Sequence, residues 1–264
     1  MLVYKIVNEA EKEIAFIVNY SMHVNAFNGG KAISADYSGV ISKTLRDIYG
    51  EDVAVLFMPG ACGDTNCYDY RFNYPLPGMA DKRHLYVGRS LAGTILGMDA
   101  FYMFPQNTDI AAARTKLAIK ERPYRPLDDK IDQTFGKYER TKFIWDLFAQ
   151  EKEQWIKERG GRLDTYNVPV SVLTFGKDMA IVAGAGELFV ELGLRLKKQS
   201  PFKYTMVWEL ADGHFGYIPT KGDFIKGGYE TRKNAFTSPL DESAGDMIVD
   251  YWTEQLNNIR KVQS

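Results

Sequence analysis

The sequence predicts an α/β protein: a mixed sheet with flanking helices, forming a single domain with a long helical insertion. Three observations support this class. Short apolar runs with strand-like spacing recur along the chain, amphipathic helical segments separate them, and the connections include both tight hairpins and long crossovers. The 264 residues are 45% hydrophobic and 25% charged, which is ordinary globular composition with enough chain to bury a large core.

The first half of the chain alternates predicted strands and helices. Each boundary is marked by a turn residue, a helix cap or a glycine stop. The predicted elements are a hairpin of Val3–Val7 and Ile14–Tyr20, a helix from Ser34 or Asp36 to Tyr49 that ends at Gly50, a buried strand at Val53–Met58, a helix at Asp81–Met98 and a strand at Thr108–Glu121.

The second half begins with a predicted insertion. Pro123 and Pro126 break the chain, and a charged helical stretch then runs from Leu127 to Arg159 before Gly160 and Gly161. We expect residues 127–160 to form a helical insertion or lid. The elements predicted after it are a hairpin of Val168–Phe175 and Met179–Ala183, a helix at Glu187–Lys198, a strand at Phe202–Leu210 and a closing helix at Ser243–Val262.

Charge and apolar patterning exclude several classes of protein. Lys and Arg total 33 against 34 Asp and Glu, and no basic run is present, so no nucleic-acid partner is expected. The longest apolar stretches are too short for a transmembrane segment. The N-terminus lacks a signal-peptide pattern, so the chain is expected to stay in the cytoplasm or to have lost a preceding section. Cys62 and Cys67 are predicted to be reduced thiols, although a small bridge between them is geometrically open.

Three segments that follow predicted strands carry candidate chemistry. His23 ends an apolar strand and is either a metal ligand or a hydrogen-bonded rim histidine. Gly60–Asn66 is either a ligand-facing loop, in which Asp64 and Asn66 face a crevice, or a tight connection with Asx-type caps. Glu187 follows two glycines at the predicted start of a helix, where the helix dipole favours a carboxylate whether or not it has a function.

A fourth segment places an aromatic residue between glycines. Tyr217 lies in His214–Thr220, ahead of Gly227–Glu230. A tyrosine at such a turn usually serves packing. It can also act as a phenolate ligand or as a hydrogen-bond donor to an oxyanion.

In this order, the segments resemble the neutral/alkaline, non-lysosomal ceramidase family. The resemblance extends over most of Tyr4–Glu230, and it rests on the order and separation of short motifs. These motifs are Asn19–His23 with Ser34–Gly39 downstream, Gly60–Asn66, Gly186–Phe189, and Gly216–Thr220 through Gly228–Glu230.

The resemblance implies a zinc-dependent amidase that cleaves the N-acyl bond of ceramide. Two histidines, a glutamate and a tyrosine hold zinc in that family, and the second histidine, the glutamate and the tyrosine fall on His23, Glu187 and Tyr217. Nitrogen and oxygen ligands suit one zinc ion with a bound water. The family's Gly-Asp-x-Ser-Pro-Asn loop falls on Gly63–Tyr68.

The sequence departs from the family in two ways. The first zinc histidine belongs to a Thr-His-Thr-His-Ser motif well upstream, so we expect the N-terminal section and the fourth protein ligand to be missing. His214 lies close to Tyr217, but the family has no metal histidine there, and His84 is expected on the surface of a helix. Asn66 occupies the position of the loop serine, and Thr65 should point the other way. We likewise expect the family's C-terminal β-sandwich to be missing.

We therefore expect a zinc-dependent amide hydrolase that acts on a lipid or small amide through a metal-bound water. Tyr217 and loop donors such as Asn66 would stabilise the oxyanion, and Asp64 would line the site. The alternative is an incomplete, non-catalytic fragment that binds a lipid or a partner through an apolar cleft. Association with the missing N-terminal section, or of the chain with itself, is expected in that case.

Overall fold

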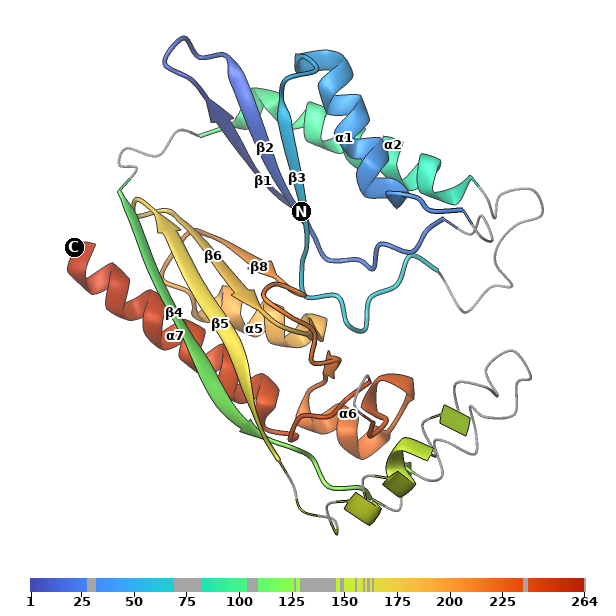
Figure 1. The fold of residues 1–264 in the computed structure, drawn as a ribbon. Helices are drawn as coiled ribbons and strands as arrows, with labels where there is room; N and C mark the ends of the chain where they lie inside the picture. Colours follow the sequence, from blue (N-terminus) through green and yellow to red (C-terminus); the bar gives the residue numbers. More distant parts are fainter. Residues whose placement is uncertain are drawn as a thin grey trace.

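Two sheets with helices packed against them form the body of the molecule (Figure 1). The structure is a computed structural model of the chain. It describes residues 1–27, 32–68, 82–103, 109–125, 127–128, 146–147, 150–154, 156–158, 160, 162, 164–234 and 237–263.

The first sheet has the order β1 (Leu2–Val7), β2 (Glu13–Tyr20), β3 (Ala54–Pro59). β1 and β2 are antiparallel, whereas β2 and β3 are parallel because helix α1 (Asp36–Tyr49) connects them as a crossover. Helix α2 (Arg83–Gly97) packs beside α1 on the same face of the sheet (Figure 1). The core between them includes Phe16, Val18, Tyr37, Ile41, Leu45, Val53 and Ile95.

The second sheet has four strands in the order β4–β5–β6–β8. The first three are antiparallel neighbours, and β6 and β8 are parallel, with helix α5 between them in the sequence. The bounds are Ile110–Lys120 for β4, Thr165–Phe175 for β5, Met179–Gly184 for β6, Val190–Gln199 for α5, Tyr204–Trp208 for β8 and Ala244–Gln263 for α7. Helices α5 and α7 bury Leu192, Leu196, Ile248 and Trp252 against this sheet.

Hydrogen bonds join the two sheets along β3 and β8. The Asn19 Nδ2 group, on β2, donates to the carbonyl of Met58 in the neighbouring β3, at 2.9 Å, and across to the second sheet, to the carbonyl of Val207 in β8, at 2.8 Å. The backbone N–H of Glu209 donates to the carbonyl of Pro59 at 3.1 Å. Side chains from both sheets share a small core of Tyr4, Ile17, Ile181 and Met206. The carboxyl ends of β2, β3, β8 and β6 therefore lie along one edge.

Short elements lie near this edge. A two-stranded parallel sheet pairs β7 (Glu187–Leu188) with β9 (Tyr217–Ile218). Helix α6 spans Lys221–Lys226, and a 3-10 turn occurs at Tyr229–Thr231. A second 3-10 turn, Asp99–Phe101, follows α2 at the opposite end of the first sheet, where Lys5 pairs with Asp99 and with Glu13 at the start of β2. The predicted helix at Glu187–Lys198 is wrong at its start, because Glu187 is in a strand and the helix begins at Val190. Glu187 therefore does not lie in the first turn of a helix, and a helix dipole does not account for its position.

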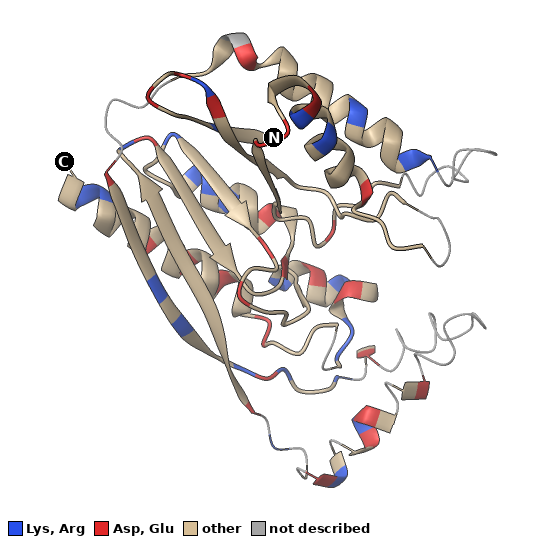
Figure 2. Ribbon diagram, turned by 45° about the horizontal axis from the view of Figure 1, so that its top comes forward, with Lys and Arg blue, Asp and Glu red and all other residues tan. Residues whose placement is uncertain are grey.

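The other predicted elements are confirmed to within a few residues, and so is the mixed α/β class. The predicted insertion at 127–160 lies largely outside the described residues. Acidic and basic side chains are interspersed along the helices, whereas the strands are mostly uncharged (Figure 2). Within the described part of the chain, no helix has the length and apolarity needed to span a membrane.

Candidate metal and active site

The predicted site residues gather at the shared carboxyl edge of the strands. His23 follows β2, and Gly60–Asn66 follows β3. Glu187 follows β6, and Glu209 directly follows β8. Segments that leave the same edge of neighbouring parallel strands converge, and this edge is where open α/β sheets bind ligands.

The pairing of β7 with β9 brings Glu187 and Tyr217 together. They are partners in the parallel register, and the Glu187 N–H donates to the Gly216 carbonyl at 2.9 Å. Burial raises the pKa of the Tyr217 hydroxyl, and the charge of the neighbouring Glu187 carboxylate raises it further. His23 Nδ1 lies 3.7 Å from Glu187 Oε2, and its ring centroid lies 6.3 Å from that of Tyr217. The structure thus brings the three predicted metal ligands into one cluster.

The surroundings of His23 orient its ring. Its backbone N–H donates to the Thr65 carbonyl at 3.0 Å, and its Nε2 lies 3.3 Å from the Gly63 carbonyl oxygen. A carbonyl partner favours the tautomer that carries the proton on Nε2, which leaves the Nδ1 lone pair facing Glu187. Metal-ligating histidines commonly hold their second nitrogen in this way.

The Gly60–Asn66 loop approaches β7 closely. The Gly63 N–H donates to the Leu188 carbonyl at 2.8 Å, and a Cβ at Gly63 would overlap the Glu187 carbonyl oxygen. Gly60 packs in the same way against Ser21. Gly63 therefore allows two backbone segments to touch beside the cluster, whereas the close approach of this loop to a ligand stays a prediction.

Asp64 and Asn66 bond within and next to this loop. Asp64 Oδ1 accepts from the Val190 N–H, the first amide of α5, at 2.7 Å. Asn66 Oδ1 accepts from the Cys67 N–H at 2.8 Å. Among the described residues, the Asn66 Nδ2 group has no hydrogen-bond partner, so it keeps its donors. Asp64 fixes the loop to α5 and thereby positions it.

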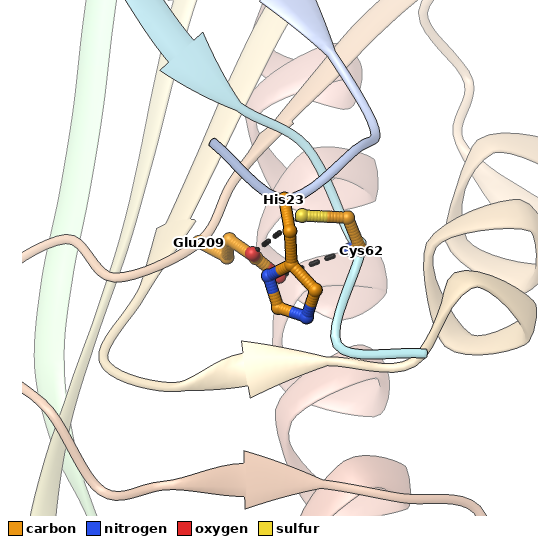
Figure 3. Close-up of side chains that lie close together, drawn as sticks. All are labelled: His23, Cys62 and Glu209. Carbon is orange, nitrogen blue, oxygen red and sulfur yellow. Dashed lines mark hydrogen bonds between the residues drawn. The ribbon is translucent and has the colours of Figure 1, made fainter. Parts of the chain in front are cut away.

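Glu209 and Cys62 are site residues that the sequence did not identify as such. The Cys62 thiol donates to Glu209 Oε1 at 2.8 Å, and the Cys62 N–H donates to Glu209 Oε2 at 3.0 Å. Both side chains lie beside His23 (Figure 3). Burial raises the pKa of Glu209 to about 8, and burial followed by the charge of Glu209 raises the pKa of the Cys62 thiol. Cys67 is a separate free thiol that contacts Asn25, so no disulfide forms.

Further titratable groups surround the cluster. His214 Nε2 lies 3.3 Å from Glu187 Oε1 and is half exposed. Burial, followed by the charge of Glu187, raises the pKa of Tyr217, so the metal-free site holds a neutral phenol there. Burial also raises the pKa of Glu230, and the Asp64 carboxylate adds to this effect. His84, on α2, is half buried against the ring of Phe27 and lies outside this cluster.

The donor set fits a divalent metal ion. Ligand atoms of His23, Cys62 and Glu209 all lie within 4.8 Å of one another, so this cluster could hold a metal. Glu187 and Tyr217 add oxygen donors next to the same imidazole. Imidazole, thiolate and carboxylate are all ligands that zinc accepts.

Two solved structures share the fold over 98% of the chain. One is the neutral ceramidase from Pseudomonas aeruginosa, with a TM-score of 0.68 and 11% sequence identity. The other is a ceramidase complexed with C2, with a TM-score of 0.63 and 12% identity. The chain spans about half the length of both, 46% and 47%. No family model and no curated protein matches the sequence. The chain therefore has a ceramidase-like fold.

Proposed function

We propose that this chain is a metal-dependent amide hydrolase that cleaves the N-acyl bond of a lipid or small amide. The convergence of His23, Glu187 and Tyr217 from three separate segments, with His23 Nδ1 3.7 Å from Glu187 Oε2, carries the proposal. The likeness to two solved ceramidases supports it independently. Zinc is the metal we propose, because nitrogen and oxygen donors converge without the cage of oxygens that calcium prefers.

His23, Glu187 and Tyr217 would hold the ion, with nearby donors available to complete the set. A zinc ion held there would polarise an amide carbonyl and lower the pKa of water. The chain's own residues would do the rest. The Gly63 carbonyl holds the His23 ring in one orientation, and Asp64 holds the loop against α5.

Amide hydrolysis builds negative charge on the carbonyl oxygen, and the site has donors for it. A Tyr217 side chain that binds the ion as the neutral phenol would keep its O–H proton and could donate it. The Asn66 Nδ2 group keeps its donors in the loop beside His23. We propose that these two groups donate hydrogen bonds to the developing oxyanion, in place of the serine hydroxyl that the resemblance would place at residue 66.

The test is release of free amine from a panel of N-acyl amides. The purified chain is supplied with Zn²⁺ and incubated with amides that range from short-chain N-acyl amines to ceramides, and the amine is measured with a fluorogenic reagent. Tyr217→Phe should lower kcat by about 10²-fold, the usual cost of losing one oxyanion donor. Glu187→Gln should lower both metal content and activity.

Glu191→Gln is the matched control, since Glu191 is an exposed carboxylate in the first turn of α5. It should leave amine release unchanged. The proposal is wrong if no amide in the panel is cleaved with zinc supplied, or if Glu187→Gln keeps full activity.

An apolar pocket away from this site favours a second candidate function, binding of an acyl chain without catalysis. It has a volume of about 220 Å³ and lies between the start of β1 and the segment around Phe101. Its lining includes Met1, Val3, Tyr4, Met98, Phe101, Tyr102, Met103 and Met179. Metal-independent binding of a fluorescent fatty acid, abolished by Val3→Asp and accompanied by no amide cleavage, would support this candidate over the hydrolase.

A further inference from the structure

A thiol and a carboxylate are buried together behind His23. Cys62 is fully buried and Glu209 is only 3% exposed. Two hydrogen bonds from Cys62 to the Glu209 carboxylate, at 2.8 Å and 3.0 Å, hold the pair in place (Figure 3). The hydrolase proposed above assigns no role to either side chain.

The pair lacks a compensating positive charge. No lysine or arginine of the described residues pairs with Glu209. The Cys62 thiol and the His23 imidazole lie beside it, and Glu187 adds a second negative charge. A buried carboxylate without a counter-ion is strongly unfavourable, so the pocket must hold either a proton or a cation. Figure 3 shows the imidazole of His23 facing the same space.

The donor geometry is close to what zinc requires. Zinc binds sulfur at about 2.3 Å and nitrogen or oxygen at about 2.0–2.2 Å, so two ligand atoms on one tetrahedral ion lie about 3.5 Å apart. The ligand atoms of His23, Cys62 and Glu209 are within 4.8 Å of one another, and the sulfur and one carboxylate oxygen are 2.8 Å apart. Shifts of about an ångström or less would seat an ion. Thiolate selects zinc over magnesium or calcium.

We propose that Cys62 and Glu209 are metal ligands together with His23, and that the Cys62 thiolate selects a zinc-type ion. On binding, the Cys62 S–H proton is released to solvent, together with the carboxyl proton of Glu209 where that group is protonated. The S–H hydrogen bond to Glu209 is replaced by two bonds to the ion. Because His23 has one ring nitrogen free to bind, this inference concerns the same ion as the proposed hydrolase site, with Cys62 and Glu209 as the nearby donors. It does not depend on which substrate is cleaved.

The experiment is a Co²⁺ titration of the full chain. Protein purified under reducing conditions is stripped with a chelator, and Co²⁺ is added while near-ultraviolet absorption is recorded. A thiolate bound to Co²⁺ gives a strong sulfur-to-cobalt charge-transfer band. Wild type should show this band, and Cys62→Ser should lose it. Competition with Zn²⁺ should show that Cys62→Ser binds Zn²⁺ about 100-fold or more weakly than wild type, since even residues that contact a metal only indirectly contribute 10–100-fold to its affinity.

Cys67→Ser is the matched control, because Cys67 is also buried but contacts Asn25 rather than the cluster. It should keep the band. If far-ultraviolet circular dichroism shows that Cys62→Ser is misfolded, Glu209→Gln replaces it, and should keep the band while binding Zn²⁺ more weakly. Failure of wild type to bind Co²⁺, binding without the band, or unchanged Zn²⁺ affinity in Glu209→Gln would each overturn the inference.

Amide cleavage measured on the same samples separates this inference from the proposed function. A charge-transfer band without cleavage of any amide leaves the thiolate site standing and removes the hydrolase. Cleavage without the band removes the thiolate site and leaves the hydrolase standing.

Discussion

The buried carboxylate of Glu209 makes stability depend on pH, and Glu209→Gln tests this. Burial raises the pKa of Glu209 from its ordinary value of 4.5 to about 8 in the folded chain. Below pH 4.5 both the folded and unfolded states carry the proton, so ionisation of Glu209 does not change the free energy of unfolding. Between pH 4.5 and 8 the unfolded state loses the proton while the folded state keeps it. Stability should therefore fall as pH rises through this window, and level off above it.

The size of the effect follows from the two pKa values. A difference of one in pKa corresponds to about 1.36 kcal/mol, so the whole window is worth ~5 kcal/mol. The unfolded state is already partly ionised at pH 5, which leaves about 3.5 kcal/mol to be lost between pH 5 and pH 8. A glutamine cannot ionise. The Glu209→Gln side chain keeps one acceptor for Cys62. The substitution should lower the free energy of unfolding by about 1–3 kcal/mol at every pH, because one of the two Cys62 donors loses its partner.

The assay is urea unfolding of the metal-free protein, followed by tryptophan fluorescence at pH 5, 6, 7 and 8 with EDTA present. The stability of wild type relative to Glu209→Gln should decline by about 3 kcal/mol over this range. Glu254→Gln, at an exposed position on α7, should track wild type throughout. Parallel profiles for wild type and Glu209→Gln would refute the assignment of a buried, protonated carboxyl.

Four further substitutions test the packing of the fold, each by urea unfolding. Gly63→Ala should lower the free energy of unfolding by about 1–3 kcal/mol, because its Cβ meets the Glu187 carbonyl. Gly93→Ala should raise it by about 1 kcal/mol, because Gly93 is exposed in α2 with open space around it. Equal effects of the two substitutions would contradict the close approach at Gly63. Tyr4→Phe should cost about 1 kcal/mol by removing the hydroxyl that bonds two carbonyls of the second sheet. Asp128→Asn should cost about 3–5 kcal/mol, because it leaves a buried arginine without its charged partner; a loss below 1 kcal/mol would show that the pair is solvated.

Short-range patterns were enough to predict most elements. The hairpins and the helix at the C-terminus depend on residues that are close in sequence, and their apolar spacing predicts them directly. β7 could not be predicted in this way. It is two residues long, so it has no period, and it exists because Glu187 pairs with Tyr217 thirty positions along the chain. The two glycines before Glu187 resembled a helix start, and this local signal was misleading.

The candidate site was predicted in part. The sequence indicated His23, Glu187 and Tyr217 through a resemblance, and the structure brings them together, while their roles stay predictions. Glu209 was missed because it lay inside the predicted strand Phe202–Leu210. One signal was available, since a carboxylate directly after a buried strand occupies the same position as the residues that follow β2 and β3. The sequence predicted its partner Cys62 only as a reduced thiol and gave it no place in the site.

Backbone hydrogen bonds hold the two acidic residues of this site, Glu187 and Glu209, in place. Glu187 is held by β-pairing with Tyr217, and the Glu209 N–H bonds the Pro59 carbonyl at the end of β3. Moving the backbone of either residue would break the β7–β9 pairing or the Glu209–Pro59 hydrogen bond. Among the described residues, no lysine or arginine pairs with Glu209 to offset its charge. A fold that directs two acidic groups toward one imidazole must compensate them with a proton or with an ion. The pH profile measures the first of these, and the cobalt titration measures the second.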